Sequence, residues 1–386
     1  MATRCCSFEI VAELDGARAG VLRLPHGDVP TPAFMPVGTR GAVRGVDPAE
    51  LRGAGTHMVL ANTYHLWERP GHERVRELGG LHGLMRWDGP ILTDSGGYQV
   101  FSLAEHVRLT EEGVAFRSTL DGTRRLLTPE LAVGIQEALG VDVAMALDEC
   151  IDKDADAARV AASTARTTRW LVRCLLARQQ PERTALWGIV QGGMFADQRA
   201  SHAAELRALD LDGYAIGGLS VGEGHARMLE MVEVATAELP RDRSRYLMGV
   251  GQPVDMVEAI VRGVDLFDCV LPTRAGRHGQ AYTSEGRLNL KNARFGADRG
   301  DLDPGTPGSP AAGWSRAWLR HMIQVDEMLG ARLLTLHNIR FYQHLMASMR
   351  EAVVAGDRAA LAALRARARV ASASPGAPLA DAGTGG

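Results

Sequence analysis

Short apolar runs alternate with longer amphipathic segments along most of the chain. Eight runs have the length and bounding residues of buried strands; they lie at 33–37, 58–62, 91–93, 141–147, 185–190, 213–216, 245–249 and 264–270. Between most of them apolar residues recur three and four positions apart, which predicts helices over 49–53, 128–139, 155–178, 196–208, 226–239 and 254–261. This alternation predicts an α/β fold, a closed parallel (β/α)8 TIM barrel. An open doubly wound sheet is the alternative, disfavoured because no GxGxxG motif opens the first unit.

Two segments of the chain are additional to the eight strands and helices of a minimal barrel. Residues 101–127 predict a hairpin, inserted after the third strand, around the turn Asp121-Gly122. Residues 281–365 predict a C-terminal subdomain that begins with a second hairpin and ends in helices over 314–329 and 338–355. The catalytic core would then comprise residues 1–280. Residues 372–386 are mostly Ser, Pro, Gly and Ala with few bulky apolar groups, which predicts a disordered tail.

The composition narrows the class of protein. With 386 residues, 46% of them apolar, the chain can bury a sizeable core. A formal charge of −3 argues against a generally basic surface, so any nucleic acid must be held by a local patch. The sequence has no signal-like or membrane-spanning apolar run, so a cytoplasmic protein is expected. Its five cysteines show no CxxC spacing, which predicts free thiols.

Polar side chains stand at the ends of four predicted strands. They are Asp94 after 91–93, Asp148 after 141–147, Gln191 after 185–190, and Asp268 within 264–270. Any one of these aspartates can be a helix cap or a turn residue. Functional groups of a parallel barrel, however, gather at this end of the strands. Two carboxylates delivered in this way can act on one sugar bond.

Glycines and one basic segment accompany these strand ends. The glycines at 96–97, 192–193 and 217–218 let backbone N–H groups approach a ligand, although tight turns explain them about as well. The basic segment 273–279 follows Asp268 and reads as a loop hinged by glycine. It is either a phosphate-binding loop or a solvated surface loop.

Four longer motifs resemble one known family, the bacterial tRNA-guanine transglycosylases, also called queuine tRNA-ribosyltransferases. They are FMPVGT at 34–39, GPILTDSGGYQ at 89–99, YAIGGLSVGE at 214–223 and LTLHN at 334–338. The resemblance covers some 300 residues. It implies a TIM barrel with an appended zinc subdomain, and exchange of guanine at the tRNA wobble position for a 7-deazaguanine base of the queuosine pathway.

The resemblance also implies residue roles. Asp268 is the expected nucleophile and Asp94 the expected general acid/base of a retaining double displacement, which needs two carboxylates about 5 Å apart. Asp148 is expected to accept the N–H edge of guanine. The other expected base-binding residues are Ser95, Gly96, Gly97, Tyr98, Cys150, Gln191, Gly218, Leu219 and Met248. The residues expected to hold anticodon-loop RNA are Gly249, Gln252, Asp255, Thr273, Arg274 and Arg277.

The largest departure from the family concerns its structural zinc. The family pattern is Cys-x-Cys-x-x-Cys with a distant His, whereas this chain has Thr306, Gly308 and Ala311 at the cysteine positions and keeps His337. One imidazole cannot hold a structural zinc, so no metal and no cofactor are predicted. The homodimer of the family uses nearby surface, so a homodimer is possible rather than implied. Val221 stands where eukaryotic forms have glycine, which favours the smaller aminomethyl precursor of queuine.

Two other functions remain open from sequence. One is a catalytically silent RNA-binding accessory subunit, suggested by the missing zinc ligands. The other is base exchange on a different nucleic acid or a nucleoside. Retention of both Asp94 and Asp268 with their surrounding loops favours the active enzyme.

Overall fold

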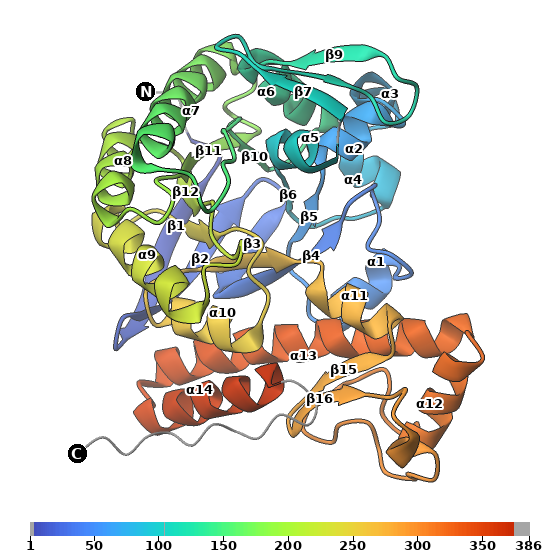
Figure 1. Ribbon diagram of the computed structural model, residues 1–386. Coiled ribbons are helices and arrows are strands. Elements are labelled where there is room, and N and C mark those ends of the chain that lie inside the picture. The colour runs from blue at the N-terminus through green and yellow to red at the C-terminus, as the bar shows by residue number, and fades with distance from the viewer. Residues whose placement is uncertain (1–3, 104, 374–386) are drawn as a thin grey trace.

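The computed structural model describes residues 4–103 and 105–373. Eight parallel strands close into a barrel in the order β4-β5-β6-β10-β11-β12-β13-β14 (Figure 1). Their bounds are β4 Ala33–Gly38, β5 Val59–Ala61, β6 Ile91–Thr93, β10 Val143–Met145, β11 Ala185–Val190, β12 Gly213–Ile216, β13 Arg245–Leu247 and β14 Leu266–Cys269. Each strand falls on one of the eight predicted runs. The TIM barrel is therefore confirmed, and the doubly wound sheet is excluded.

Helices surround the barrel. The six predicted helices are confirmed, with ends within two residues of the prediction: α1 Pro48–Gly53, α6 Pro129–Leu139, α7 Ala157–Ala177, α8 Ala196–Ala208, α9 His225–Glu238 and α10 Pro253–Ile260. Three short helices that the pattern missed lie between β5 and β6: α2 Thr63–Glu68, α3 His72–Glu77 and α4 Gly80–Met85. Asp47, Thr128 and Asp156 cap α1, α6 and α7 by accepting a backbone N–H of the first turn. None of the helices among the described residues has the length and apolar character to cross a membrane.

An antiparallel sheet that the sequence pattern did not predict precedes the barrel. Its strands are β1 Ser7–Leu14, β2 Ala17–Leu24 and β3 Gly27–Thr31. Phe8, Leu22 and Val29 of this sheet join one buried cluster with barrel residues such as Trp187 and Leu266. The sheet thus shields the N-terminal end of the barrel interior from water.

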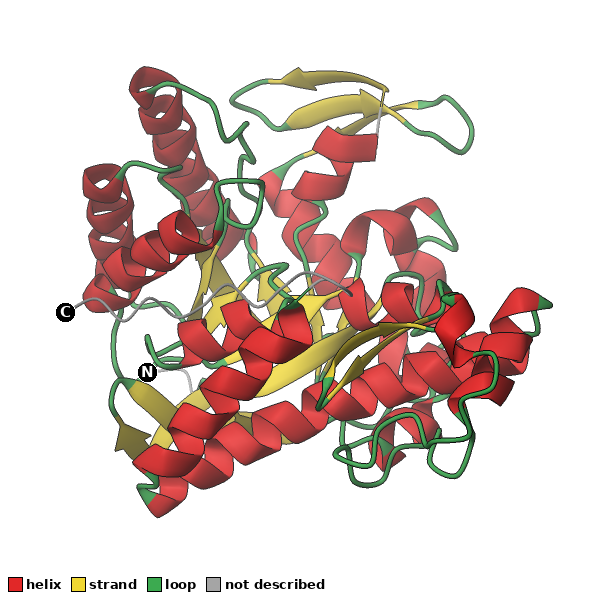
Figure 2. Cartoon of the chain, turned by 60° about the horizontal axis from the view of Figure 1, so that its bottom comes forward, coloured by secondary structure: helices red, strands yellow, loops and turns green. Residues whose placement is uncertain are grey.

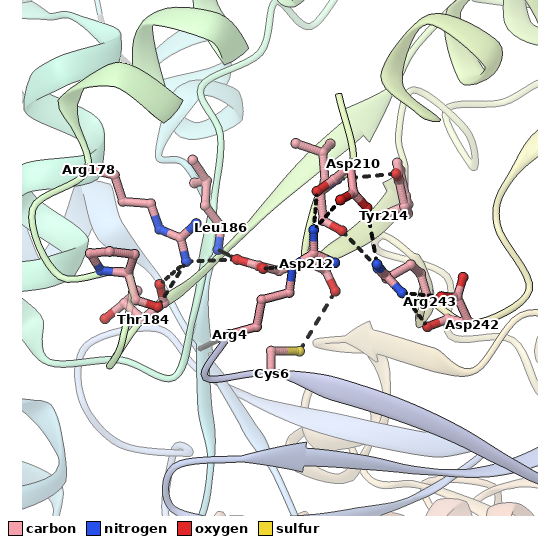
Figure 3. Close-up of polar contacts among 12 residues, drawn as sticks. Arg4, Cys6, Arg178, Thr184, Leu186, Asp210, Asp212, Tyr214, Asp242 and Arg243 are labelled. Atoms are coloured by element: carbon pink, nitrogen blue, oxygen red, sulfur yellow. Dashed lines mark hydrogen bonds and ion pairs between the residues drawn. The ribbon is translucent and has the colours of Figure 1, made fainter. Parts of the chain in front are cut away.

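Buried carboxylates also fix this N-terminal end. Asp142, Asp212 and Asp265 directly precede β10, β12 and β14, and each accepts a backbone N–H near the start of a neighbouring strand. Figure 3 shows Asp212 between two arginines, with Nη2 of Arg178 2.7 Å from its Oδ2. Cations therefore accompany carboxylates at this end of the barrel.

The segment inserted after β6 forms a sheet of three strands rather than a hairpin of two. Helix α5 Gly97–Leu103 leads into β7 Glu105–Leu109, β8 Val114–Arg117 and β9 Arg124–Leu127. The predicted turn at Asp121-Gly122 joins β8 to β9, and Gly122 has a φ of 71° that favours glycine. Figure 2 shows this sheet at one edge of the molecule, away from the C-terminal helices.

The segment after β14 is a helix, so the predicted glycine-hinged loop is wrong. Helix α11 Leu271–Arg277 has Pro272 as its second residue, and proline suits the first helical turn. A Cβ on Gly276 would lie 2.5 Å from the backbone N of Thr335 in α13 Met328–Ala355. Gly276 therefore permits close packing of two helices and is not a hinge.

The remaining elements form a C-terminal helical subdomain. The predicted hairpin is β15 Gln280–Thr283 with β16 Gly286–Asn289, followed by a 3-10 helix Ala293–Phe295 and α12 Arg316–Gln324. Helix α13 begins ten residues before the predicted helix 338–355 and runs beneath the barrel (Figure 1). A further helix, α14 Arg358–Ser372, crosses the predicted boundary at 365. The predicted disorder is wrong for Ser372, and residues 374–386 lie outside the described residues.

Candidate active site

Three carboxylates stand at the C-terminal end of the barrel strands. Asp94 directly follows β6, Asp148 comes three residues after β10, and Asp268 is the third residue of β14. Because all strands of a closed parallel barrel point the same way, their C-terminal ends share one face. The structure thus brings the three predicted acids to that face, and their roles remain predictions.

Neutral donors surround Asp94. Its Oδ1 accepts the backbone N–H groups of Thr63 (3.0 Å) and Gly96 (3.2 Å), and its Oδ2 accepts Nδ2 of Asn62 (2.5 Å). Burial raises the pKa of Asp94 to about 7; the hydrogen bonds from Thr63 and Gly96 oppose the shift, and the negative charge of Asp268 adds to it. A carboxyl group with such a pKa can both give and take a proton near neutral pH.

Asp268 is held by one of its two oxygens. Its Oδ1 accepts the hydroxyl of Tyr246 (2.5 Å) and the backbone N–H of Gly249 (2.7 Å). Oδ2 accepts no hydrogen bond from the described residues, so it is the oxygen that is free to contact a ligand. Burial raises the pKa of Asp268, whereas the Tyr246 and Gly249 hydrogen bonds lower it.

Asp148 anchors a buried polar cluster. Its Oδ1 accepts the hydroxyl of Ser95 (3.3 Å) and its Oδ2 accepts Nε2 of Gln191 (2.7 Å), with the Cys150 thiol 3.8 Å from Oδ2. Burial raises the pKa of Asp148, and the hydrogen bond from Gln191 is the largest opposing effect. Four predicted base-binding residues from three separate segments therefore meet in one place.

Glycine backbone completes this cluster. A Cβ on Gly97 would lie 3.2 Å from the carbonyl oxygen of Asp148, and one on Gly218 would lie 2.5 Å from Oε1 of Gln191. That Oε1 is buried without a hydrogen-bond partner in the described part of the chain. Gly218 has a φ of +67°, and its N–H and that of Leu219 have no hydrogen-bond acceptor among the described residues. Two successive unpaired N–H groups of this kind suit a carbonyl or anionic oxygen.

The two predicted stacking residues differ in setting. Tyr98 lies in the first turn of α5 and is 58% exposed. Met248 follows β13 and packs partly buried against the core of the barrel. An exposed ring and a half-buried thioether at the same end of the barrel are compatible with stacking on a flat base, which stays a prediction.

The predicted RNA-binding residues divide into two groups. Arg274 and Arg277 lie on α11, and burial followed by the charges of Arg44 and Arg274 lowers the pKa of Arg277. Three guanidinium groups therefore lie near one another. In contrast, Thr273 is buried and its hydroxyl donates to the Val270 carbonyl.

The other predicted RNA-binding residues lie around α10. Asp255 accepts a hydrogen bond from His225 (2.5 Å), and Gln252 precedes the helix with a buried Oε1 that has no partner among the described residues. Gly249 donates its N–H to Asp268. This glycine therefore links the predicted RNA segment to the predicted nucleophile.

The residues at the family zinc positions do not fit a metal ion. Nδ1 of His337 lies 2.8 Å from Oγ of Ser309, and Nε2 lies 2.8 Å from the carbonyl oxygen of Tyr282. The carbonyl requires an N–H on Nε2, so Nδ1 accepts the serine proton. Burial lowers the pKa of His337, which keeps this imidazole neutral. Both nitrogens are occupied, and Gly308 and Ala311 offer no side-chain ligand atom.

Asp303 organises the same loop. Its oxygens accept the hydroxyls of Ser284 and Thr306, both at 2.5 Å, and the backbone N–H groups of Ser284 (3.1 Å) and Gly305 (3.0 Å). Thr306 thus serves as a hydrogen-bond donor at a position where the family has a metal ligand. Among the described residues, the sole group of metal-binding side chains with suitable spacing is His26, His82 and Asp142 at the opposite end of the barrel.

Sequence reasoning missed three residues that contact or surround the site. Asn62 stands at the end of the run that became β5, so the strand-end rule that found Asp94 also applied to it. Tyr246 lies inside β13, where a tyrosine has the pattern of a core residue. Arg44 follows β4 in a loop without a motif. Of the three, only Asn62 could have been predicted from the sequence, by its position at a strand end.

Comparison with known proteins agrees with this geometry. The family described as Queuine tRNA-ribosyltransferase matches residues 14–371. A Queuine tRNA-ribosyltransferase of Sphingopyxis alaskensis is 52% identical over 358 residues, which cover 92% of this chain and 96% of the relative. One of Caulobacter vibrioides is 50% identical over 350 residues, covering 90% and 94%. The chain belongs to the queuine tRNA-ribosyltransferase family, as its motifs predicted.

Proposed function

We propose that this enzyme, a pentosyltransferase by its family, exchanges guanine in tRNA for a 7-deazaguanine base by double displacement at the ribose. The observation that carries the proposal is the difference between two partly buried carboxylates at one end of the barrel. Asp268 has one oxygen fixed and one free of hydrogen bonds, whereas both oxygens of Asp94 are fixed and its pKa is about 7. The first suits a nucleophile and the second an acid/base.

In the first step the free oxygen of Asp268 attacks C1′ of the ribose. The C1′–N9 bond breaks, its electron pair leaves with guanine, and Asp94 gives its proton to the departing base. Tyr246 and Gly249 hold the other oxygen of Asp268, which fixes the direction of attack. The product is an ester between Asp268 and ribose, with inverted configuration at C1′.

In the second step the incoming base restores the original configuration. Asp94, now ionised, takes the proton from N9 of the incoming base, whose nitrogen attacks C1′ from the face that guanine left. The C1′–O bond to Asp268 breaks and the carboxylate regains its electron pair. Two inversions give net retention, and no proton is lost to solvent.

The Asp148 cluster would read the base. Asp148 accepts from the N–H edge of guanine, while Gln191 and the N–H groups of Gly218 and Leu219 face its carbonyl oxygen. The second N–H of the Gln191 amide is available for this contact because the first donates to Asp148. Recognition of an extruded base on its edge is how enzymes select a nucleobase for chemistry.

The incoming base is proposed to be the aminomethyl precursor of queuine. Val221 lies on the loop that follows β12 and donates its backbone N–H to Glu223 (2.8 Å). Its branched side chain restricts room beside the base-binding loop. Val221→Gly should therefore increase use of queuine relative to the precursor, measured by competition between the two bases.

The RNA partner is proposed to be held at phosphates by Arg44, Arg274 and Arg277. After burial, the positive charges of Arg44 and Arg274 also lower the pKa of Arg277, and cations placed this close together favour a shared anionic ligand. Contacts of this kind position the substrate, and unstacked loop bases supply the sequence information. A local patch of this kind reconciles the net charge of −3 with a polyanionic substrate.

The C-terminal subdomain is proposed to need no zinc, because Asp303, Ser309 and His337 form hydrogen bonds where the family binds metal. Purified protein should hold well under one zinc per chain, and a chelator should leave its unfolding temperature unchanged. About one zinc per chain would overturn this. Asp303→Asn, with the exposed Asp301→Asn as its control, should lower stability by roughly 1–3 kcal/mol because donors lose their acceptor.

Radiolabelled guanine tests the function directly. Purified protein is incubated with the label and either tRNA or DNA, in the wild type and in Asp268→Asn. Label that enters tRNA only with the wild type supports the proposal. No incorporation would favour an RNA-binding accessory subunit, and label in DNA would favour a different nucleic acid.

A further inference from the structure

Arg199 is a buried guanidinium behind the loops that follow β11 and β12. It projects from the first turn of α8 with no exposed surface. No carboxylate of the described residues hydrogen-bonds to it; Glu223 acts only through its charge. A buried arginine without an ion pair is rare, because removing a cation from water costs several kcal/mol. A buried charge that is kept at this cost suggests a functional role for Arg199.

Three backbone carbonyls hold the guanidinium. Nη2 donates to Gly193 (2.8 Å), and Nη1 donates to Gly217 (3.2 Å) and Val190 (3.4 Å). Burial lowers the pKa of Arg199 to about 10, so the group stays charged at neutral pH. The hydrogen bonds of Arg199 therefore connect the loop after β11, which contains Gln191, to the loop after β12, which contains Gly218.

One of these bonds reaches the predicted base contact through a single peptide group. The carbonyl of Gly217 and the N–H of Gly218 belong to the same peptide. A donor on the carbonyl polarises that peptide and strengthens its N–H as a donor. The Gly218 N–H is one of the two unpaired groups proposed to face the carbonyl oxygen of guanine. Through this peptide, the positive charge of Arg199 strengthens the hydrogen bond that the Gly218 N–H is proposed to donate to the guanine oxygen.

We propose that Arg199 is a positioning residue that stabilises negative charge on the departing guanine through the Gly217–Gly218 peptide. The inference rests on the proposed function. When the C1′–N9 bond breaks, its electron pair spreads over the purine and reaches the carbonyl oxygen before Asp94 delivers its proton. A fixed positive charge favours this state over the neutral bound base. The effect therefore falls on kcat rather than on KM.

Two bases of different acidity test the charge. The extra ring nitrogen of 8-azaguanine makes it more acidic than guanine, so it binds more readily as an anion. We measure the ratio of the two Kd values at pH 8 in the wild type, Arg199→Met and Arg199→Lys. The control His202→Leu removes a neutral acceptor of the Gln191 N–H (2.9 Å), since burial lowers the pKa of His202 to about 4.

The wild type should favour 8-azaguanine about tenfold, Arg199→Met should lose that preference, and Arg199→Lys should keep most of it. His202→Leu should weaken both bases equally. Guanine exchange by Arg199→Met should lose about 10- to 100-fold in kcat with little change in KM for tRNA, less than the loss for a direct oxyanion donor.

Unchanged preference and kcat in Arg199→Met would overturn the proposal. If that variant does not fold, loss of preference in folded Arg199→Lys would overturn it equally. Failure of the proposed function looks different, because the wild type would then neither bind nor exchange guanine.

Discussion

The two ends of the barrel use the same residue type in opposite ways. At the C-terminal end Asp94 and Asp268 accept hydrogen bonds from amides and a hydroxyl, with no cation paired to them among the described residues. At the N-terminal end Asp212 pairs with Arg178 (2.7 Å), and Nε of Arg18 lies 2.9 Å from Oδ1 of Asp265. The two sets therefore differ in partners and in exposure, since Asp94 and Asp268 are partly exposed whereas Asp212 and Asp265 are buried.

The partners also separate the proton affinities. Burial raises the pKa of Asp94 to about 7 and raises that of Asp268. Burial alone would raise the pKa of Asp142 as well, but hydrogen bonds from His82, the Ile91 amide and His26 lower it. A carboxyl group whose pKa is raised can exchange a proton near neutral pH and so suits catalysis. A carboxylate whose charge is stabilised by hydrogen bonds stays ionised and holds strands together.

The largest predicted effect is at the C-terminal end. Asp268→Asn should reduce guanine exchange by at least about 10⁴-fold, because an amide is no nucleophile. Its unfolding temperature should stay within a few degrees of the wild type, since no ion pair is broken and one oxygen remains to accept. Label incorporation and thermal unfolding of the same preparation check both halves. More than a hundredth of wild-type activity would exclude Asp268 as the nucleophile.

Asp94→Asn should reduce exchange by about 10²- to 10⁴-fold, the usual contribution of a general acid/base. Single-turnover release of guanine by the wild type should slow as pH rises through about 7, because Asp94 then loses the proton it must donate. Asp94→Asn should not show this fall in rate with rising pH. An identical pH profile in both proteins would contradict the assignment.

The same pKa predicts the sign of a stability change. The folded-state pKa of Asp94 lies above its ordinary value of 3.8, so folding favours the protonated form. Its contribution to stability is complete below about pH 4 and is lost as pH rises through about 7. Urea unfolding of the wild type relative to Asp94→Asn should show this decline. A relative gain in stability over that range would contradict it.

The N-terminal end should respond in the opposite way. Asp265→Asn should lower the free energy of unfolding by about 3–5 kcal/mol, because it leaves the buried Arg18 without its counter-ion. The kcat of the protein that remains folded should change less than twofold. Adding Arg18→Met should recover part of the loss, measured by urea unfolding. A large loss of kcat in fully folded Asp265→Asn would show that this carboxylate also serves catalysis, which would contradict a purely structural role for the N-terminal end of the barrel.

The smallest effect concerns tRNA affinity. Arg274→Gln should raise the Kd for tRNA several-fold and reduce the slope of log Kd against log salt by about 0.7–0.9, as loss of one phosphate contact does. Arg4→Gln is the control, because Arg4 lies at the N-terminal end and pairs with Asp210 (2.6 Å). Equal slopes for Arg274→Gln and the wild type would exclude Arg274 from the RNA interface.

The sequence predicted the barrel because each strand is short, apolar and bounded by turns, and it predicted the acids because they stand at strand ends. It missed the sheet β1–β3, whose strand Ser7–Leu14 alternates exposed and buried positions and ends on no functional group. It also took Gly276 for a hinge, because the approach of Thr335 to that glycine depends on tertiary packing. Apart from Gly96, the partners of Asp94 and Asp268 lie on or directly after other strands, so those hydrogen bonds cannot be derived from local pattern.

In the proposed mechanism Asp268 forms a covalent bond to C1′ of the ribose, while Asp94 donates and then accepts the proton. Mass spectrometry of protein trapped during turnover with tRNA tests it most directly. Double displacement predicts an adduct of base-free ribose, still joined to the RNA phosphates, on the peptide that contains Asp268, and no such adduct in Asp268→Asn. An adduct on Asp94, or full exchange by protein that forms no adduct, would contradict this mechanism.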